Sequence, residues 1–143
     1  MFDNVLLTVD LNNEASWKAA LPQAVALVRA SKGTLHVMTV VPNFGSSMVA
    51  SLFPADFREK ALTKAEAELE GLIAAQVPSD VKAVPHLGYG EIHDEVLKAI
   101  TKNKADVVVM ASHAPDRVRE FLVGSQADRV VRRSPVSVLV VRG

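Results

Sequence analysis

The 143-residue chain contains no cysteine, which excludes disulfides, thiolate catalysis and cysteine-bound metals. It also has no excess of charge, because sixteen lysines and arginines balance sixteen aspartates and glutamates. That balance argues against nucleic acid or an anionic membrane as the main partner. No apolar run reaches the ~20 residues that span a bilayer, and the first residues lack the basic and apolar regions of a signal peptide. We therefore expect a cytoplasmic protein.

What the chain does have is a high apolar content, 49%, at a length typical of one domain. Short β-rich runs alternate with helix-favouring segments, and no linker divides residues 1–143. This alternation predicts a single α/β domain with a parallel sheet and helices on both faces. Strands are expected at 5–9, 34–41, 81–87, 106–110 and 136–141, and helices at 15–30, 56–76, 91–103 and 126–133.

Prolines and glycines add detail to this pattern. Pro22 removes a backbone donor inside the first helical segment, which predicts a kink or a late start. Gly33 is expected to cap the carboxyl end of the same helix. Pro85 disfavours a central place in the sheet for the third strand, and Gly88-Tyr89-Gly90 is expected to turn the chain after it. The next helix should bury one apolar face, made by Ile92, Val96, Leu97 and Ile100.

The last quarter of the chain carries the strongest indication of a ligand. The run 106–110 leads into Ala111-Ser112-His113-Ala114-Pro115-Asp116, and after a gap Gly124-Ser125 begins a helical segment. The first N–H groups of a helix lack partners and carry partial positive charge. A phosphate at Gly124-Ser125 would satisfy them, and glycine would allow its close approach. The alternative is an ordinary helix start with Ser125 as the N-cap.

Polar residues also follow the first strand. Ligands of open α/β sheets bind beyond the carboxyl ends of the strands, where the strand order reverses. If that order is 3-2-1-4-5, Thr8-Val9-Asp10 and Met110-Ala111-Ser112 face each other across one crevice. Asp10 has the alternative role of capping the following helix. None of the four histidines has the spacing of a metal-ligand pair, so no metal site built by the protein is expected.

Taken together, these features resemble the universal stress protein family. The family's C-terminal signature is glycine, two residues, glycine, nine residues, glycine, then serine or threonine. Its positions fall here at Ala111, Ala114, Gly124 and Ser125. Asp10, the turn with Gly88 and the closing strand after Pro135 match in order, so the resemblance covers the whole chain. It implies a Rossmann-like fold similar to that of the adenine nucleotide alpha hydrolases.

The chain departs from the signature at two glycines. Ala111 stands at a strand end, where an ordinary φ is expected. Ala114 precedes Pro115, which directs it toward extended geometry and away from positive φ. The phosphate loop must therefore run differently from the glycine form, although one branch of the family resembles this chain in its Ser-His-x-Pro-Asp stretch.

Matched by position, the resemblance implies an adenine nucleotide site. Asp10 would accept a hydrogen bond from the ribose or the adenine, and Val40 would offer backbone groups to the adenine edge. Met110 and Ala111 would floor the pocket, while the start of the last helix would surround the phosphates. The complete expected set is Thr8, Val9, Asp10, Val40, Met110, Ala111, Ser112, Ala114, Gly124, Ser125, Gln126 and Ala127.

The function implied by the resemblance is that of an ATP-binding, stress-response regulatory module with an unknown protein partner. ATP would carry a divalent cation, Mg or Mn, on its phosphates. No residue is an evident general base, so an enzyme is not expected. Two alternatives stay open: a nucleotide-independent interaction module of the same fold, and a slow ATP hydrolase.

The last strand is expected to form a homodimer. The segment Val136–Val141 is apolar, and only Pro135 and Arg142 flank it. An edge strand without proline, bulge or inward charge is a template for pairing with another chain. Family members that resemble this chain pair in this way, antiparallel across a two-fold axis, and such a contact closes at two subunits.

Overall fold

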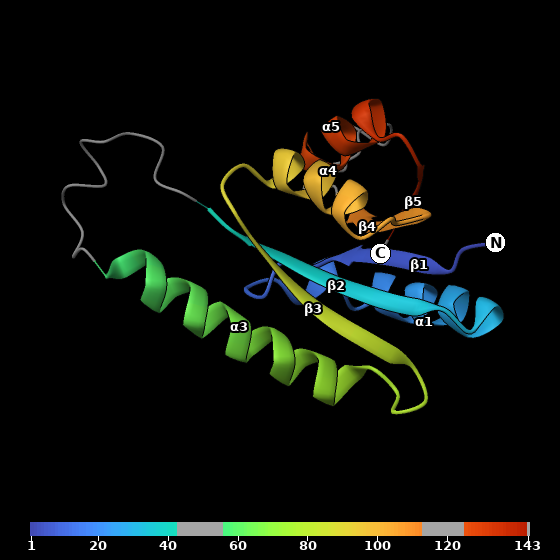
Figure 1. The fold of residues 1–143 in the computed structure, drawn as a ribbon, viewed down its shortest axis with the longest axis horizontal. Helices are drawn as coiled ribbons and strands as arrows, with labels where there is room; N and C mark the ends of the chain where they lie inside the picture. Colours follow the sequence, from blue (N-terminus) through green and yellow to red (C-terminus); the bar gives the residue numbers. More distant parts are fainter. Residues whose placement is uncertain (43–55, 113–124, 143) are drawn as a thin grey trace.

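The computed structural model describes residues 1–42, 56–112 and 125–142. Its elements are β1 (Asn4–Thr8), η1 (Glu14–Ser16), α1 (Ala20–Ser31), β2 (Thr34–Val41), α3 (Phe57–Gln76), β3 (Lys82–Tyr89), α4 (Ile92–Lys102), β4 (Val107–Ser112), α5 (Ser125–Arg133) and β5 (Ser137–Arg142). The strands form one parallel sheet in the order β3-β2-β1-β4-β5 (Figure 1). The predicted fold class and strand order are therefore confirmed.

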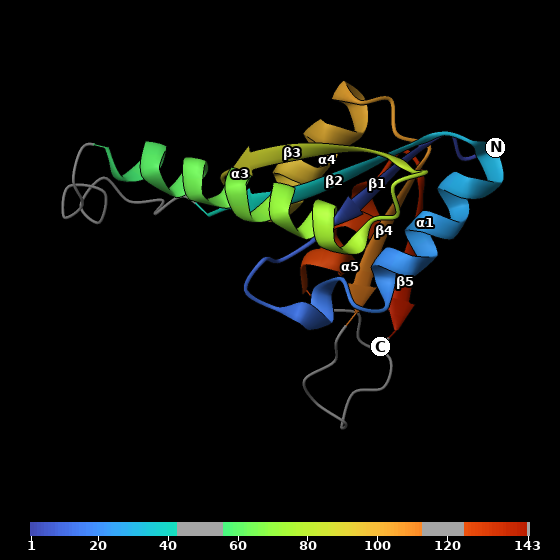
Figure 2. The same cartoon turned by 90° about the horizontal axis from the view of Figure 1, so that it is seen from below.

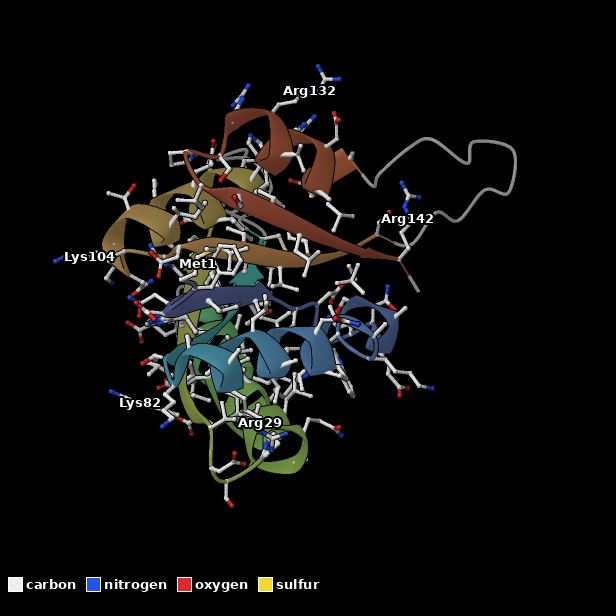
Figure 3. All side chains as sticks on the ribbon, turned by 90° about the vertical axis from the view of Figure 1, so that its right-hand side faces the viewer. Met1, Arg29, Lys82, Lys104, Arg132 and Arg142 are labelled. Atoms are coloured by element: carbon white, nitrogen blue, oxygen red, sulfur yellow. The ribbon has the colours of Figure 1, made fainter. Side chains whose placement is uncertain are left out.

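Helices cover both faces of the sheet, because successive side chains of a strand point to opposite sides. Leu7 of β1 is buried in a core shared with α1 and α3. Its neighbour Leu6 is buried in a second core shared with α4 and α5. Figures 1 and 3 show these two pairs of helices on opposite sides of the strands. With both faces covered, β1 is apolar throughout its centre rather than alternating.

The strand order reverses beside β1. From β1 the chain moves outward to β2 and β3 by way of α1 and α3, then returns through α4 to β4 on the other side of β1. Adjacent crossovers leave β1 and β4 toward opposite faces, so their carboxyl ends flank a crevice. The first turns of α3 reach beyond these strand ends (Figure 2). Among the described residues, no helix is long and apolar enough to cross a membrane.

Two of the proline predictions are confirmed. Helix α1 begins at Ala20, so Pro22 occupies its first turn, where a missing N–H costs little. Of the two predicted effects of Pro22, the late start of the helix is therefore the one that is confirmed. Strand β3 lies at the edge of the sheet, with Pro85 opposite Val37 of β2.

The glycine predictions need correction. The left-handed residue after α1 is Lys32, with φ of 58°, and not Gly33. Gly33 is needed for space instead, because a Cβ there would lie 1.9 Å from the carbonyl oxygen of Asp3. Gly88 belongs to β3 and not to a turn, and a Cβ on it would lie 2.9 Å from Cε of Met38. Among the glycines that the structure describes, only Gly90 has a positive φ, 139°.

The amino ends of the strands are joined by hydrogen bonds. One carboxylate oxygen of Asp106, Oδ2, accepts the N–H groups of Asp3 at 2.9 Å and Asn4 at 2.8 Å. The N–H of Thr34 donates to the Asp3 carbonyl at 2.7 Å, and the Ser31 hydroxyl donates to the Phe2 carbonyl at 2.8 Å. Figure 3 shows Met1, Lys82 and Lys104 at this end of the sheet and Arg142 at the other. These backbone groups of the amino end are thus satisfied within the protein.

Two histidines lie side by side on the face that α4 covers. Nδ1 of His36 is 2.8 Å from Nε2 of His86, and Nε2 of His36 is 3.1 Å from Oδ1 of Asn4. The pKa of His36 is lowered, first by burial and then by charge on His86 and Lys82. The pKa of His86 is lowered by burial and by Lys102. Both rings therefore favour the neutral form.

Candidate functional site

A cavity of about 700 Å³ opens at the carboxyl ends of β1, β2 and β4. Helices α3, α4 and α5 complete its walls. Nine of the residues expected from the sequence line it: Thr8, Val9, Asp10, Val40, Met110, Ala111, Ser125, Gln126 and Ala127. Ser112 is described but does not line the cavity, while Ala114 and Gly124 lie outside the described residues.

The floor of the cavity is fixed by the last bonds between β1 and β2. The N–H of Val9 donates to the Met38 carbonyl at 2.8 Å. The buried hydroxyl of Thr39 donates to the Val9 carbonyl at 2.9 Å. Because both backbone groups of Val9 already have a partner, this residue presents chiefly its apolar side chain to a ligand.

Asp10 opens the turn that follows β1. Its N–H donates to Oγ of Ser16 at 2.7 Å, and its Oδ1 accepts the N–H of Asn12 at 2.9 Å. The capping role considered for Asp10 is taken by Asn13, whose side chain accepts the N–H of Ala15 at 3.1 Å. Asp10 is exposed, and among the described residues no hydrogen bond reaches its second carboxylate oxygen, Oδ2. Within the described part of the chain, that oxygen can accept from a ligand.

The opposite wall contains the first turn of α5. Ser125 is its first residue, and Ala127 is buried two positions later. The side chain of Gln126 is engaged elsewhere, because its Oε1 accepts the N–H of His93 at 3.2 Å and lies 3.3 Å from Nδ1 of the same ring. This turn can still offer a ligand its backbone N–H groups and the exposed hydroxyl of Ser125.

Ser112 is the last residue of β4. Its side chain is buried, with 5% of the residue exposed. Within the described part of the chain, Oγ of Ser112 has no hydrogen-bond partner. An unsatisfied buried hydroxyl costs roughly 1–3 kcal/mol, so the end of β4 holds a polar group for which the described residues supply no partner.

The sequence did not indicate the wall formed by α3. Ala61 and Ala65 lie four residues apart and are half-buried on a helix that is mostly exposed. On the same wall Nζ of Lys64 is 3.8 Å from Oε1 of Glu68. The small residues one turn apart are the only signal that could have indicated this face, because the charged residues around them mask any apolar stripe.

A second omission concerns α4. Ile92 was expected in the core, but it is 37% exposed and lines the cavity together with the buried Val96. Other lining residues not expected from the sequence are Leu11, Asn12, Ser16, Met38, Thr39, Val41 and Pro42. The walls are therefore mainly apolar, and the ionisable side chains among the lining residues are Asp10, Lys64 and Glu68. Apolar walls with a few polar groups suit an organic ligand.

The described residues contain no group of three or more histidines, aspartates or glutamates that could hold a metal ion. A cation in this cavity would therefore need ligands from another source, such as the oxygens of a phosphate chain.

Comparison with known proteins places the chain in a family. The family model described as "Universal stress protein family" matches residues 1–142. A putative universal stress protein of Staphylococcus aureus strain USA300 is 29% identical over an alignment of 143 residues. The alignment covers 99% of this chain and 84% of that protein.

Solved structures share the fold. A universal stress protein in complex with cAMP superposes with a TM-score of 0.62 at 20% identity, covering 99% of this chain and 97% of the other. The universal stress protein from Archaeoglobus fulgidus in complex with dAMP has a TM-score of 0.69 at 16% identity, covering 98% and 97%. Since the family model spans all but the last residue, the chain belongs to the universal stress protein family.

Proposed function

We propose that this protein is a regulatory module that holds ATP, with Mg or Mn on its phosphates, in the cavity between β1 and β4. The observation that carries the proposal is one continuous cavity. It joins an apolar slot at the β1 and β2 ends to the first turn of α5. An adenine base and a phosphate chain need those two surroundings.

The base would lie on the strand ends. Val9, Val40 and Met110 supply apolar surface there, and the backbone of Val40 supplies hydrogen-bonding groups for the adenine edge. Asp10 stands at the mouth with Oδ2 free to accept from a ribose hydroxyl. A carboxylate accepts but does not donate, so it recognises hydroxyls rather than phosphates.

The phosphates would lie at the first turn of α5. Backbone N–H groups there lack helical partners, and the helix dipole favours an anion. The buried Ser112 hydroxyl, which lacks a partner among the described residues, supports a further polar group at this end. Two relatives of the same fold are complexes with cAMP and with dAMP, which supports an adenine nucleotide as the ligand class.

Calorimetry with a series of ligands tests this proposal. Adenosine, dAMP, ADP and ATP are titrated in the presence of magnesium, and affinity is expected to rise with the number of phosphates. No heat and no thermal shift at millimolar ATP would contradict nucleotide binding and favour the interaction module. Release of phosphate during prolonged incubation with ATP would favour the slow hydrolase.

A matched pair of valine substitutions separates binding from folding. Gly124→Val is expected to abolish ATP binding in a folded protein, since a branched side chain would occupy the space of the phosphates. Gly71→Val is the control, because a Cβ at Gly71 meets nothing within 4 Å. Unchanged affinity in folded Gly124→Val would place the phosphates elsewhere.

We also propose that the protein is a homodimer paired through β5. This strand is an edge of the sheet, so its outer backbone groups are open to a partner strand. Leu139 is 38% exposed on it, whereas Val138 packs against the core beneath α5. A lysine at Val138 would thus disturb the fold, and Leu139→Lys is the cleaner variant.

Sedimentation tests the dimer. The wild type is expected to have the mass of two chains at micromolar concentration, and Leu139→Lys the mass of one. Val131→Lys on α5 is the control, since Val131 is 46% exposed but lies outside the edge strand. A single-chain mass for the wild type would contradict the dimer.

A further inference from the structure

We infer that His93 of α4 is a positioning residue for the phosphate donors of α5 and that it acts through Gln126. This inference rests on the proposed nucleotide site and deepens it. His93 is buried and is not among the described residues that line the cavity, so it does not reach a ligand itself. Its contacts with Gln126 are nevertheless made at the turn where the phosphates would bind.

The amino end of α4 is capped by another helix. Its N-cap residue, Glu91, makes no side-chain capping bond. The N–H of His93, in the first turn, donates instead to Oε1 of Gln126 at 3.2 Å. A helix start normally finds such an acceptor in its own flanking residue. Here one bond gives the N–H of His93 an acceptor and at the same time holds Gln126, the second residue of α5.

The two contacts fix the orientation of the Gln126 amide. A backbone N–H only donates, so the atom of Gln126 facing it must be the oxygen. The same oxygen lies 3.3 Å from Nδ1 of His93, and the contact is a hydrogen bond when Nδ1 carries a hydrogen. The other ring nitrogen, Nε2, lies 3.4 Å from Oδ1 of Asp94. The amide hydrogens of Gln126 must then be directed away from His93. The oxygen and the nitrogen of the Gln126 amide are thereby held in one orientation.

The support behind this bridge is well packed. Val96 and Ile100 of α4 are buried against the sheet, in the same core as Val130 of α5. Helix α5 has nine residues, and Ser125 and Gln126 stand at its very start, where helices fray. Because His93 connects this start to the better packed α4, it holds the N–H groups of residues 125–127 in place for an anion.

A positioning role predicts a loss that depends on phosphate. Calorimetry is performed with Mg-ATP and with adenosine on the wild type and on His93→Leu. Removing the ring donor is expected to weaken ATP binding about tenfold, as for the loss of one hydrogen bond of about 1.4 kcal/mol. Adenosine should bind as before, because it does not use the first turn of α5. Its unchanged affinity also shows that the variant is folded.

A double-mutant cycle tests the route through Gln126. If His93 acts through this side chain, His93→Leu adds nothing to the loss already caused by Gln126→Ala. Arg132→Gln is the control on the same helix, because it removes only the exposed ion pair with Asp128, in which Nε and Oδ2 are 3.1 Å apart. Its ratio of ATP to adenosine affinity should equal that of the wild type.

Three outcomes would overturn the inference. One is a wild-type ratio of ATP to adenosine affinity in His93→Leu, and another is an equal loss of both ligands. The third is additive losses in the double variant. If the wild type itself binds ATP and adenosine equally, the proposed phosphate site is wrong and the inference fails with it. By contrast, if the wild type prefers ATP over adenosine and His93→Leu keeps that preference, only the role of His93 is wrong.

Discussion

The two ends of the sheet differ in how their polar groups are satisfied. At the amino end, Asp106 accepts two backbone N–H groups of the segment that enters β1, and the Asp3 carbonyl accepts the N–H of Thr34. At the carboxyl end a cavity of about 700 Å³ separates the strands from three helices. There, among the described residues, one oxygen of Asp10 and the hydroxyl of Ser112 have no partner.

The two ends of this sheet therefore differ in role: one holds groups that stabilise the fold, and the other holds groups that can still bind a ligand. Polar groups that satisfy each other close the amino end, so substitutions there should cost stability and leave affinity unchanged. At the carboxyl end, the groups without partners among the described residues are an oxygen of the exposed Asp10 and the buried hydroxyl of Ser112. Substitutions there should cost affinity and little stability.

The largest effect is expected from Gly33→Ala at the amino end. The new Cβ would lie 1.9 Å from the Asp3 oxygen and 2.6 Å from its carbon, so the backbone must move. We expect a loss of about 3 kcal/mol in the free energy of unfolding, the upper range for overpacking. Urea unfolding measures it. Affinity for nucleotide in the folded fraction should not change.

Gly71→Ala in α3 is the matched control for that substitution. It adds the same methyl group where nothing lies within 4 Å. Alanine is favoured over glycine in a helix by about 0.5–1 kcal/mol, so the control should gain stability. If both alanine variants lose stability equally, the close approach at Gly33 is not the cause.

Asp106→Ala should have the next largest effect. It removes the acceptor of two backbone N–H groups, and hydrogen bonds to a charged group contribute about 1.5–3 kcal/mol. We expect a loss of about 2 kcal/mol in stability by urea unfolding, with nucleotide affinity unchanged. Asp106→Asn keeps an oxygen at this place and should lose less. A change in affinity without a change in stability would break the division.

Asp10→Ala should reverse the pattern at the carboxyl end. The exposed side chain contributes one bond to the turn, so stability should change by no more than about 0.5 kcal/mol. Nucleotide affinity should fall about tenfold, or about 1.4 kcal/mol, because the acceptor for the ribose is lost. Asp10→Asn keeps Oδ1 for the N–H of Asn12 and isolates the effect of charge. Calorimetry and urea unfolding together decide the outcome.

The smallest effect is a pH dependence of the β2–β3 pair. The pKa values of His36 and His86 are lowered in the folded protein, so the unfolded chain binds protons first as the pH falls. The stability contributed by the neutral pair is present above about pH 6.5 and is lost progressively below it. Unfolding measured across this range should show the decline, and His86→Gln should reduce it. An unchanged slope in His86→Gln would assign the decline to other groups.

Most of the fold could be predicted from local pattern. Continuous apolar runs indicated the strands, and Pro22 and Pro85 correctly indicated a helix start and an edge. The errors arose where contacts distant in sequence decide. Gly33 looks like a helix cap, but its neighbour Lys32 takes the left-handed conformation, and the carbonyl of Asp3 requires the glycine. No local pattern reports a contact thirty residues away.

The candidate site was predicted on its strand side and only partly elsewhere. Strand ends of a parallel sheet meet at one edge, so Asp10 and Met110 could be placed together from the sequence. The α3 wall depends on how a helix of weak apolar pattern lies across the sheet. Gln126 was expected among the phosphates, but its side-chain oxygen is bound to His93. The choice between two polar partners is made by packing, which the spacing of residues does not reveal.

The contrast between the two edge strands limits how the molecule can assemble. β3 carries Pro85, which has no N–H to offer, and the exposed Lys82, both of which discourage the addition of a strand. β5 carries neither proline nor lysine. Such a sheet has one edge strand open to pairing, so it can join one other copy in this way. If two copies pair through β5, as proposed, neither keeps an open edge of this kind, and assembly by strand pairing would end at the dimer.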